Sequence, residues 1–257
     1  MSLLSRTRWL GFTVLALLLS ACLSGSGGPS GPQVVGDGTK ILFIGNSHTY
    51  VNDVPGILQS LADSAGGERV AVASIALPNY ALIDHWIEGV APREVAKGGW
   101  AWVVMQQGWT PGGIYRDTLR LAAKNFGVEI SKIGARGAMY QTWPPSNRPQ
   151  DFDASILSYE LAAADINGVV LPVARAWLET WKRNPDAALY AVDGLHASVS
   201  GSYLAAIVMY AKLLNRSPVG LPSRLRTRSG AVITVDPTLA RTLQEAAAAV
   251  TASASVR

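Results

Sequence analysis

The chain has 257 residues, of which 49% are hydrophobic and 16% charged, a composition typical of a globular protein and not of a disordered or fibrous one. Its 22 Lys and Arg against 18 Asp and Glu give a formal charge of +4, without the clustered basic face of a nucleic-acid binder. We therefore expect no nucleic-acid partner. The single cysteine excludes an intramolecular disulfide, and the histidines lie far apart in the chain, so we expect neither a metal nor another cofactor.

The first residues have the features of a bacterial export signal. Arg6 and Arg8 precede the apolar run Trp9–Leu19, which at about eleven residues is too short to span a bilayer. The run leads into Leu-Ser-Ala-Cys, which resembles a lipobox and predicts lipidation of Cys22; an ordinary secretory signal is the alternative. We expect a lipoprotein signal peptide over residues 1–21 and a protein lipid-anchored to the bacterial cell envelope, on the periplasmic or outer-membrane side. The Gly-, Ser- and Pro-rich residues 22–39 predict a flexible tether.

From residue 40 onward, short apolar runs alternate with amphipathic stretches. Strands are predicted over residues 40–45, 69–75, 102–106, 137–142 and 169–173. Helical spacing covers 54–65, 115–133, 153–164, 198–214 and 237–252, whereas 83–94 is less regular and 217–235 is expected to be a loop or short hairpin. Strands that are apolar on both faces and separated by helices indicate a parallel sheet covered on two sides. The sequence thus predicts an α/β fold, a three-layer α/β/α sandwich around a five-stranded parallel sheet, as a single domain over 40–257 that ends in a helix.

Two polar segments stand where this fold has its reactive crevice, past the carboxyl ends of the strands. Ser47 follows the glycine that ends the first strand, and Asp193 and His196 share one loop before a long helix. A carboxylate that holds an imidazole in one tautomer lets the imidazole accept a serine proton. Taken alone, each segment favours a helix cap over a catalytic group, with a surface histidine in the second case. Together they predict a Ser-His-Asp triad.

On these residues the chain resembles the SGNH (GDSL-like) hydrolase superfamily, and within it a bacterial lipoprotein branch of mostly unassigned substrate. The resemblance covers about residues 40–220 and rests on the segments 45–49, 103–106, 140–143, 172–177, 193–196 and 201–206. It implies a flavodoxin-like sandwich and metal-free hydrolysis of an ester, often an acetyl ester on a carbohydrate. It also implies that Ser47 is the nucleophile, His196 the base and Asp193 the residue that orients His196.

The same resemblance implies an oxyanion hole, for which this chain departs from the superfamily pattern at two positions. The Ser47 N–H would be one donor. Asn79 stands where the superfamily usually has a glycine, and Asn tolerates the left-handed backbone that such a position requires. After the third strand Gln106 replaces the usual asparagine, and Gln107 is the second choice.

Further side chains near the expected crevice are candidates for substrate binding. His48 adjoins the nucleophile, and both an orientation into the crevice and one beneath the next helix stay open. Trp109 and Trp143 follow strand ends, where they would stack on sugar rings or else pack in the core. His85 lies on an amphipathic segment and is expected to be a packed structural histidine.

The leading prediction is a serine esterase that removes a small acyl group, foremost acetyl, from an acylated small molecule, a glycan or a cell-envelope substrate. Two alternatives stay open. One is an O-acyltransferase that uses the same triad. The other is a non-catalytic envelope lipoprotein that binds glycan, which the replacement of the superfamily glycine by Asn79 motivates. The sequence makes no prediction of oligomeric state.

Overall fold

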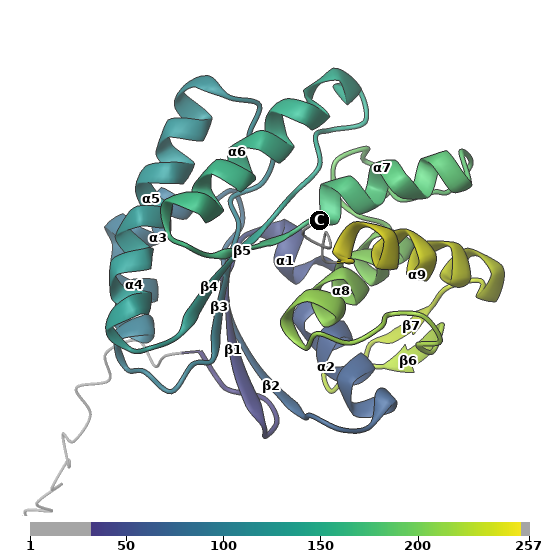
Figure 1. Cartoon of the computed structure of the whole chain (residues 1–257), viewed down its shortest axis with the longest axis horizontal. Helices are drawn as coiled ribbons and strands as arrows, with labels where there is room; N and C mark the ends of the chain where they lie inside the picture. The colour runs from purple at the N-terminus through teal and green to yellow at the C-terminus, as the bar shows by residue number, and fades with distance from the viewer. Residues whose placement is uncertain (1–31, 253–257) are drawn as a thin grey trace, which may run out of the picture. The chain divides into compact units, whose positions relative to one another are not determined.

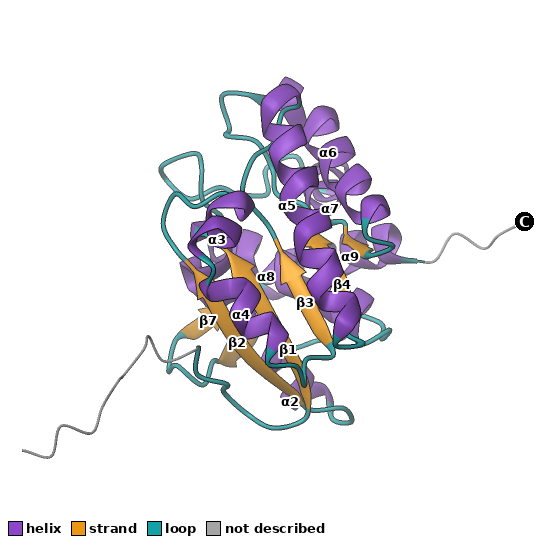
Figure 2. Ribbon diagram, turned by 90° about the vertical axis from the view of Figure 1, so that its left-hand side faces the viewer, coloured by secondary structure: helices purple, strands orange, loops and turns teal. Residues whose placement is uncertain are grey.

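The computed structural model describes residues 32–252, so the predicted signal peptide and Cys22 lie outside the described residues. Five parallel strands form one sheet in the order β2-β1-β3-β4-β5 (Figures 1 and 2). They are β1 (Thr39–Gly45), β2 (Val70–Ala76), β3 (Trp102–Met105), β4 (Arg136–Tyr140) and β5 (Val169–Leu171). This is the flavodoxin-like strand order, and the predicted five-stranded α/β/α sandwich is confirmed.

Helices cover both faces of the sheet, as Figure 1 shows with one group on each side. One layer consists of α3 (Leu82–Glu88), α4 (Val90–Ala96), α5 (Gly113–Lys132) and α6 (Phe152–Asp165). The other consists of α2 (Val54–Ala65), α7 (Val173–Arg183), α8 (Val199–Leu213) and α9 (Pro237–Thr251), with the hairpin β6 (Arg224–Arg226) and β7 (Val232–Thr234) beside α2. None of the helices in residues 32–252 has both the length and the apolar character of a bilayer span.

The two helical layers require strands that are apolar on both faces, and β1 shows how the sequence meets this. Ile41 and Phe43 belong to the core beneath α2 and α8, whereas Leu42 and Ile44 belong to the core beneath α3 and α5. All four side chains are buried, which is why this strand appears in the sequence as an unbroken apolar run.

The observed elements differ from the predicted ones in two places, and in a third place the structure decides between two possibilities. The irregular stretch 83–94 is two helices, because Gly89 has a left-handed φ of 77° and ends α3. The strand predicted over 169–173 ends at Leu171, and after Pro172 the chain forms α7, a helix that the sequence analysis did not predict. Of the two possibilities for 217–235, the structure shows the short hairpin.

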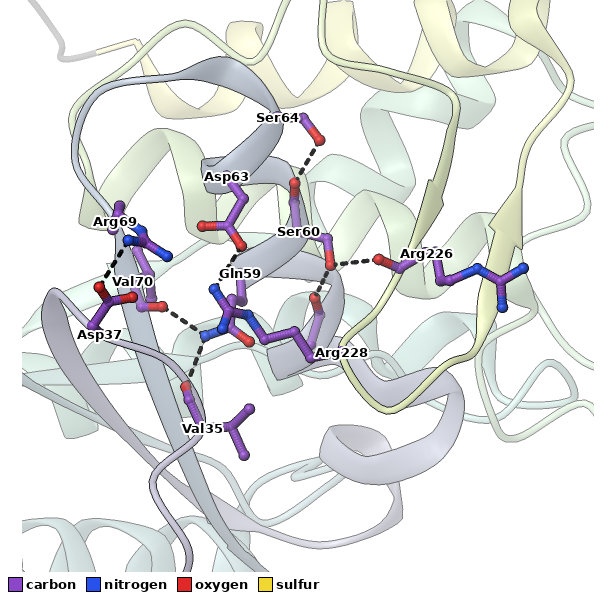
Figure 3. A network of polar contacts seen from close by, with 11 residues as sticks. Val35, Asp37, Gln59, Ser60, Asp63, Ser64, Arg69, Val70, Arg226 and Arg228 are labelled. Atoms are coloured by element: carbon purple, nitrogen blue, oxygen red, sulfur yellow. Dashed lines mark hydrogen bonds and ion pairs between the residues drawn. The ribbon is translucent and has the colours of Figure 1, made fainter.

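The residues just before β1 are ordered, although the tether was predicted to extend to residue 39. Val35 forms an antiparallel bridge with Val72 of the edge strand β2. The Gln59 amide donates to the carbonyl oxygens of Val35 and Val70, both at 2.7 Å (Figure 3). Thr39 already belongs to β1. The globular body therefore begins several residues earlier than expected, because this segment covers part of the exposed edge of β2.

Candidate active site

The site lies at the carboxyl edge of the sheet, where the chain leaves β1 and β3 toward opposite faces. In a doubly wound sheet this switch point is where ligands bind. The loops after β1, β2 and β3 carry Ser47, Asn79 and Gln106 to this edge. The loop before α8 also reaches it, because the rings of His48 and His196 have centroids 5.8 Å apart. The structure thus brings together segments almost 150 residues apart in the sequence.

Ser47 is the first residue of the short helix α1 (Ser47–Tyr50), directly after the end of β1. The preceding Asn46 caps this helix, since its side-chain oxygen accepts a hydrogen bond of 3.1 Å from the His48 N–H. Ser47 itself is half-buried. Within residues 32–252, neither its hydroxyl nor its backbone N–H forms a hydrogen bond.

The loop that precedes α8 holds Asp193 and His196 as a pair. His196 Nδ1 lies 2.6 Å from Asp193 Oδ2, and Asp193 Oδ1 accepts from the N–H groups of Leu195 and His196, each at 2.9 Å. The His196 hydrogen bond, followed by these two backbone donors, lowers the pKa of the Asp193 carboxyl to about 2. An ionised Asp193 fixes the proton on Nδ1 and leaves Nε2 as the proton acceptor. In this structure His196 and the Ser47 hydroxyl are not hydrogen-bonded to each other.

Asn46 joins the loops that follow β1, β2 and β3. Its amide donates to the carbonyl oxygens of Tyr80 and Gln107, both at 2.9 Å. Its side-chain oxygen accepts from Gln106 Nε2 at 2.8 Å, in addition to the His48 N–H. The sequence analysis did not give Asn46 a role. The sequence feature that could have indicated a role for Asn46 is its position inside the segment 45–49, next to Ser47.

The two candidate glutamines are engaged with the protein itself. Gln106 is 1% exposed, and its Oε1 accepts from the Asn46 N–H at 2.6 Å while its Nε2 donates to Asn46 Oδ1. Gln107 Nε2 donates to Thr110 Oγ1 at 3.2 Å and to the Tyr115 carbonyl at 2.9 Å. The structure thus places Gln106 where it holds the turn that carries Ser47. A bond from either amide to a substrate oxygen stays a prediction.

Asn79 has the backbone conformation that the sequence analysis considered possible for it. Its φ is 63°, in the left-handed region, and its side chain is exposed in the loop after β2. Its N–H has no hydrogen-bond partner among residues 32–252, and the same holds for the Ser47 N–H. Both predicted backbone donors are thus available.

His48 lies beneath the site, next to His196. The residue is 7% exposed, and its ring packs edge-on against Trp143 with centroids 5.1 Å apart. Its buried Nδ1 has no hydrogen-bond partner within residues 32–252. Burial, reinforced by the nearby His196, lowers the pKa of the His48 imidazole to about 4. His48 is therefore a neutral ring at physiological pH.

The two predicted aromatic candidates lie in different surroundings. Trp143 is fully buried and stacks on Trp177 with centroids 3.9 Å apart, so the structure places it in the core and leaves no ring face for a sugar. Trp109 is half-buried, and the Arg148 guanidinium lies 5.3 Å from its ring centroid. His85 is buried, and its Nε2 lies 2.7 Å from the Gly45 carbonyl oxygen, so it supports the end of β1 as a structural histidine would.

The described residues contain no group of three or more His, Cys, Asp or Glu side chains arranged to hold a metal ion. What they contain is an unengaged serine at a strand-to-helix turn, an Asp-His pair on a neighbouring loop and unpaired backbone donors. This combination has the parts that nucleophilic acyl chemistry requires.

No family model matches the chain, and no curated protein sequence does. Solved structures show which fold it has. It is similar to a DUF4886 family protein from Bacteroides uniformis, with a TM-score of 0.69 and 17% identity over 83% of this chain and 95% of that one. It is also similar to a putative SGNH hydrolase from Slackia heliotrinireducens, with a TM-score of 0.58 and 24% identity over 69% of this chain and 100% of that one.

A third similar structure is a catalytic mutant of an acetylxylan esterase from Geobacillus stearothermophilus. It has a TM-score of 0.52 and 18% identity, over 73% of this chain and 97% of that one. The chain therefore has the fold of the SGNH and GDSL-type hydrolases, as the sequence resemblance implied.

Proposed function

We propose that the protein is a serine ester hydrolase in which Ser47, His196 and Asp193 form the catalytic triad. The observation that carries the proposal is the Asp193–His196 pair, with 2.6 Å between Oδ2 and Nδ1, on a loop that reaches the turn of Ser47. An imidazole that is hydrogen-bonded to a carboxylate and lies near an unengaged serine hydroxyl is the arrangement that nucleophilic catalysis needs.

The chemistry follows from this geometry. His196 Nε2 takes the proton of the Ser47 hydroxyl as Oγ attacks the ester carbonyl, and Asp193 stabilises the imidazolium that forms. The backbone N–H groups of Ser47 and Asn79 stabilise the oxyanion. His196 then gives its proton to the departing alcohol, which leaves an acyl group on Ser47. Water, deprotonated by His196, attacks this acyl-enzyme and releases the acid and the free serine.

The contacts of Gln106 support an indirect part in this mechanism. Both polar atoms of its side-chain amide bond to Asn46, so its main role in the proposal is to hold Asn46 and thereby the turn before Ser47. The second hydrogen on Gln106 Nε2 is the candidate for a third oxyanion donor. Gln107, the alternative, would first have to give up its bond to Thr110 or Tyr115.

We propose a small acyl group, foremost acetyl, on a carbohydrate or cell-envelope substrate. The acetylxylan esterase among the similar structures supports this class, and half-buried Trp109 offers an aromatic surface near the site. Attachment to the cell envelope through a lipid on Cys22 would place the enzyme beside such substrates.

Hydrolysis of p-nitrophenyl acetate tests the proposal, with the parent protein, Ser47→Ala and His196→Ala compared. Ser64→Ala is the matched control, because the Ser64 hydroxyl donates to the Ser60 carbonyl one turn earlier in α2, its only hydrogen bond among residues 32–252. We expect turnover in the parent and the control, and a loss on the order of 10³-fold or more in both triad variants. Circular dichroism verifies that all four proteins are folded.

Two outcomes would refute the proposal. One is full activity in Ser47→Ala. The other is a folded parent that neither hydrolyses esters nor reacts at Ser47 with a fluorophosphonate probe, which would favour a glycan-binding protein. Product analysis with an added sugar acceptor separates hydrolysis from acyl transfer, because both pass through the same acyl-enzyme.

A further inference from the structure

A strained turn follows the helix of the proposed nucleophile. Asn52 has φ 57° and ψ 14°, and the next residue, Asp53, has φ 58° and ψ 55°. Two consecutive residues other than glycine in the left-handed region are unfavourable and persist only where side-chain contacts compensate. For Asp53 these contacts are structural. Its carboxylate caps α2 by accepting from the Gly56 N–H at 3.1 Å, and it accepts from the Ser229 hydroxyl at 2.7 Å.

The contacts of Asn52 reach the other half of the proposed site. Its side-chain amide donates to the Ala197 carbonyl at 3.1 Å and to the Ser202 hydroxyl at 3.0 Å. Ala197 directly follows His196, and Ser202 is a fully buried residue in the first turns of α8. Asn52 therefore links the end of the Ser47 helix to the segment that presents His196.

No other hydrogen bond within residues 32–252 joins residues 46–53 to residues 189–202. On its far side the His196 segment is fixed by its own hairpin, in which the Ala191 N–H donates to the His196 carbonyl at 2.8 Å. It is also held by the segment after β4, since Trp143 Nε1 donates to the Leu195 carbonyl at 3.0 Å and the Ser146 N–H to the Gly194 carbonyl at 2.8 Å. Among the described residues, its direct hydrogen bonds to the Ser47 helix and the turn after it come from Asn52. Ser47 and Asn52 are separated by a single helical turn, which the Val51 N–H closes onto the Ser47 carbonyl.

We propose that Asn52 is a positioning residue that sets the separation of Ser47 and His196, an inference that rests on the proposed function. Its amide holds the base segment against the nucleophile helix, and the left-handed backbone aims the amide across the gap. Because proton transfer requires hydrogen-bond contact, a shift of about 1 Å between the two segments slows acylation by about 10²-fold. Substrate affinity changes much less, because the Asn52 amide donates to the protein itself.

Asn52→Gly tests this role, because glycine accepts the left-handed backbone and removes only the amide. If Asn52 serves only the backbone conformation, the substitution is neutral or stabilising. If it positions the triad, kcat falls by about ten- to a hundred-fold with KM changed less than about threefold, and fluorophosphonate labelling of Ser47 slows in parallel. Asn52→Asp, which keeps the size but loses both donors, has the same effect.

Asn167→Gly is the matched control. Asn167 is also left-handed, with φ 49°, but it lies in the turn between α6 and β5, away from the site. We expect the Asn167→Gly variant to keep the kcat of the parent protein. Ser202→Ala, which removes one of the two acceptors, gives a smaller loss of kcat that is not additive with Asn52→Gly. This second variant serves if Asn52→Gly does not fold.

The outcomes separate this inference from the function on which it rests. A parent with Ser47-dependent turnover and an Asn52→Gly variant with unchanged kcat and labelling rate would overturn the positioning role alone. A folded parent without turnover or labelling would overturn the proposed function and this role together. Loss of activity in Asn167→Gly as well would show that the effect is general and would also overturn the role.

Discussion

The buried imidazole of His48 predicts a measurable pH dependence of stability. Its pKa falls from the ordinary 6.5 to about 4 in the folded protein, first because of burial and second because of His196; Asp193 opposes the shift weakly. Between these two values the unfolded chain binds a proton that the folded protein excludes. The free energy of unfolding therefore falls as the pH drops from about 6.5 toward about 4. Below about pH 4 His48 is protonated in both states, and its protonation lowers the stability no further.

The magnitude follows from the difference between the two pKa values. A shift from 6.5 to about 4 corresponds to about 3 kcal/mol of unfolding free energy in total. About 2 kcal/mol of this is lost between about pH 7 and about pH 5. Burial of His85 and protonation of carboxylates act in the same direction, so the diagnostic quantity is a difference between proteins and not the slope of one.

The assay is urea unfolding of the parent and His48→Gln at about pH 7 and about pH 5, within the linear range of the extrapolation. His48→Gln keeps a polar side chain of similar size but has no titrating group in this range. We expect the parent to lose about 2 kcal/mol more than the variant between the two conditions. Equal losses in both proteins would show that His48 titrates normally, and the reasoning from burial would be refuted.

Three further substitutions test the site, the end of β1 that supports it, and an ion pair between two helices. Gly45→Ala should cost about 2–4 kcal/mol in urea unfolding, because the new methyl group would lie 2.0 Å from Gln106 Oε1 and displace a buried amide. Asp193→Asn should lower kcat on p-nitrophenyl acetate by on the order of 10³–10⁴, with KM nearly unchanged, because His196 loses its fixed tautomer. Asp165→Asn should cost about 1 kcal/mol after solvent screening, because two Arg120 nitrogens bond to that carboxylate at 2.6 and 2.9 Å.

The two carboxylate substitutions each have a control in the same chain. Asp186→Asn, at an exposed carboxylate, should leave kcat unchanged. Lys132→Gln breaks an exposed pair with Glu129 within α5 and should cost less than about 0.5 kcal/mol. A Gly45→Ala protein as stable as the parent would contradict the close packing at the end of β1. Normal turnover in Asp193→Asn would contradict the triad.

The pKa of Asp165 is lowered, chiefly by its hydrogen bond to Arg120, so its contribution to stability is present at neutral pH and disappears as the pH falls below the usual carboxyl range. In acid the stability of the parent should therefore approach that of Asp165→Asn. Urea unfolding at successively lower pH measures this convergence. A gap that stays constant down to the acid limit would show that the ion pair contributes nothing.

Local patterns in the sequence predicted the fold. The strand at Thr39–Gly45 is visible because a sheet covered on both faces needs apolar residues at consecutive positions. The prediction also failed where local patterns carry little or no signal. Pro172 is the local mark of the change from strand to helix, and the strand was predicted to run through it to residue 173 while the helix after it was not predicted. The ordering of Val35 depends on Gln59, a partner that no local pattern reveals.

Within the site, the sequence identified residues by chemistry and spacing. Asp193 and His196 are three residues apart, so a single loop delivers the pair, and the structure has this contact. Trp143 was a candidate for sugar stacking, yet whether an aromatic ring faces solvent or core depends on what packs against it. Here that neighbour is Trp177, from a helix the sequence analysis did not delimit.

By itself, the sequence determined the layered architecture and the residues that carry the proposed chemistry, because hydrophobic periodicity and short-range spacing are local properties of a chain. Only the tertiary structure decided which polar groups meet. The amide of Gln106 bonds to Asn46, and the amide of Asn52 bonds to Ala197 on a segment about 145 residues away. Such contacts arise when parallel strands bring distant loops to one edge of the sheet, and no local pattern records which partners will be there.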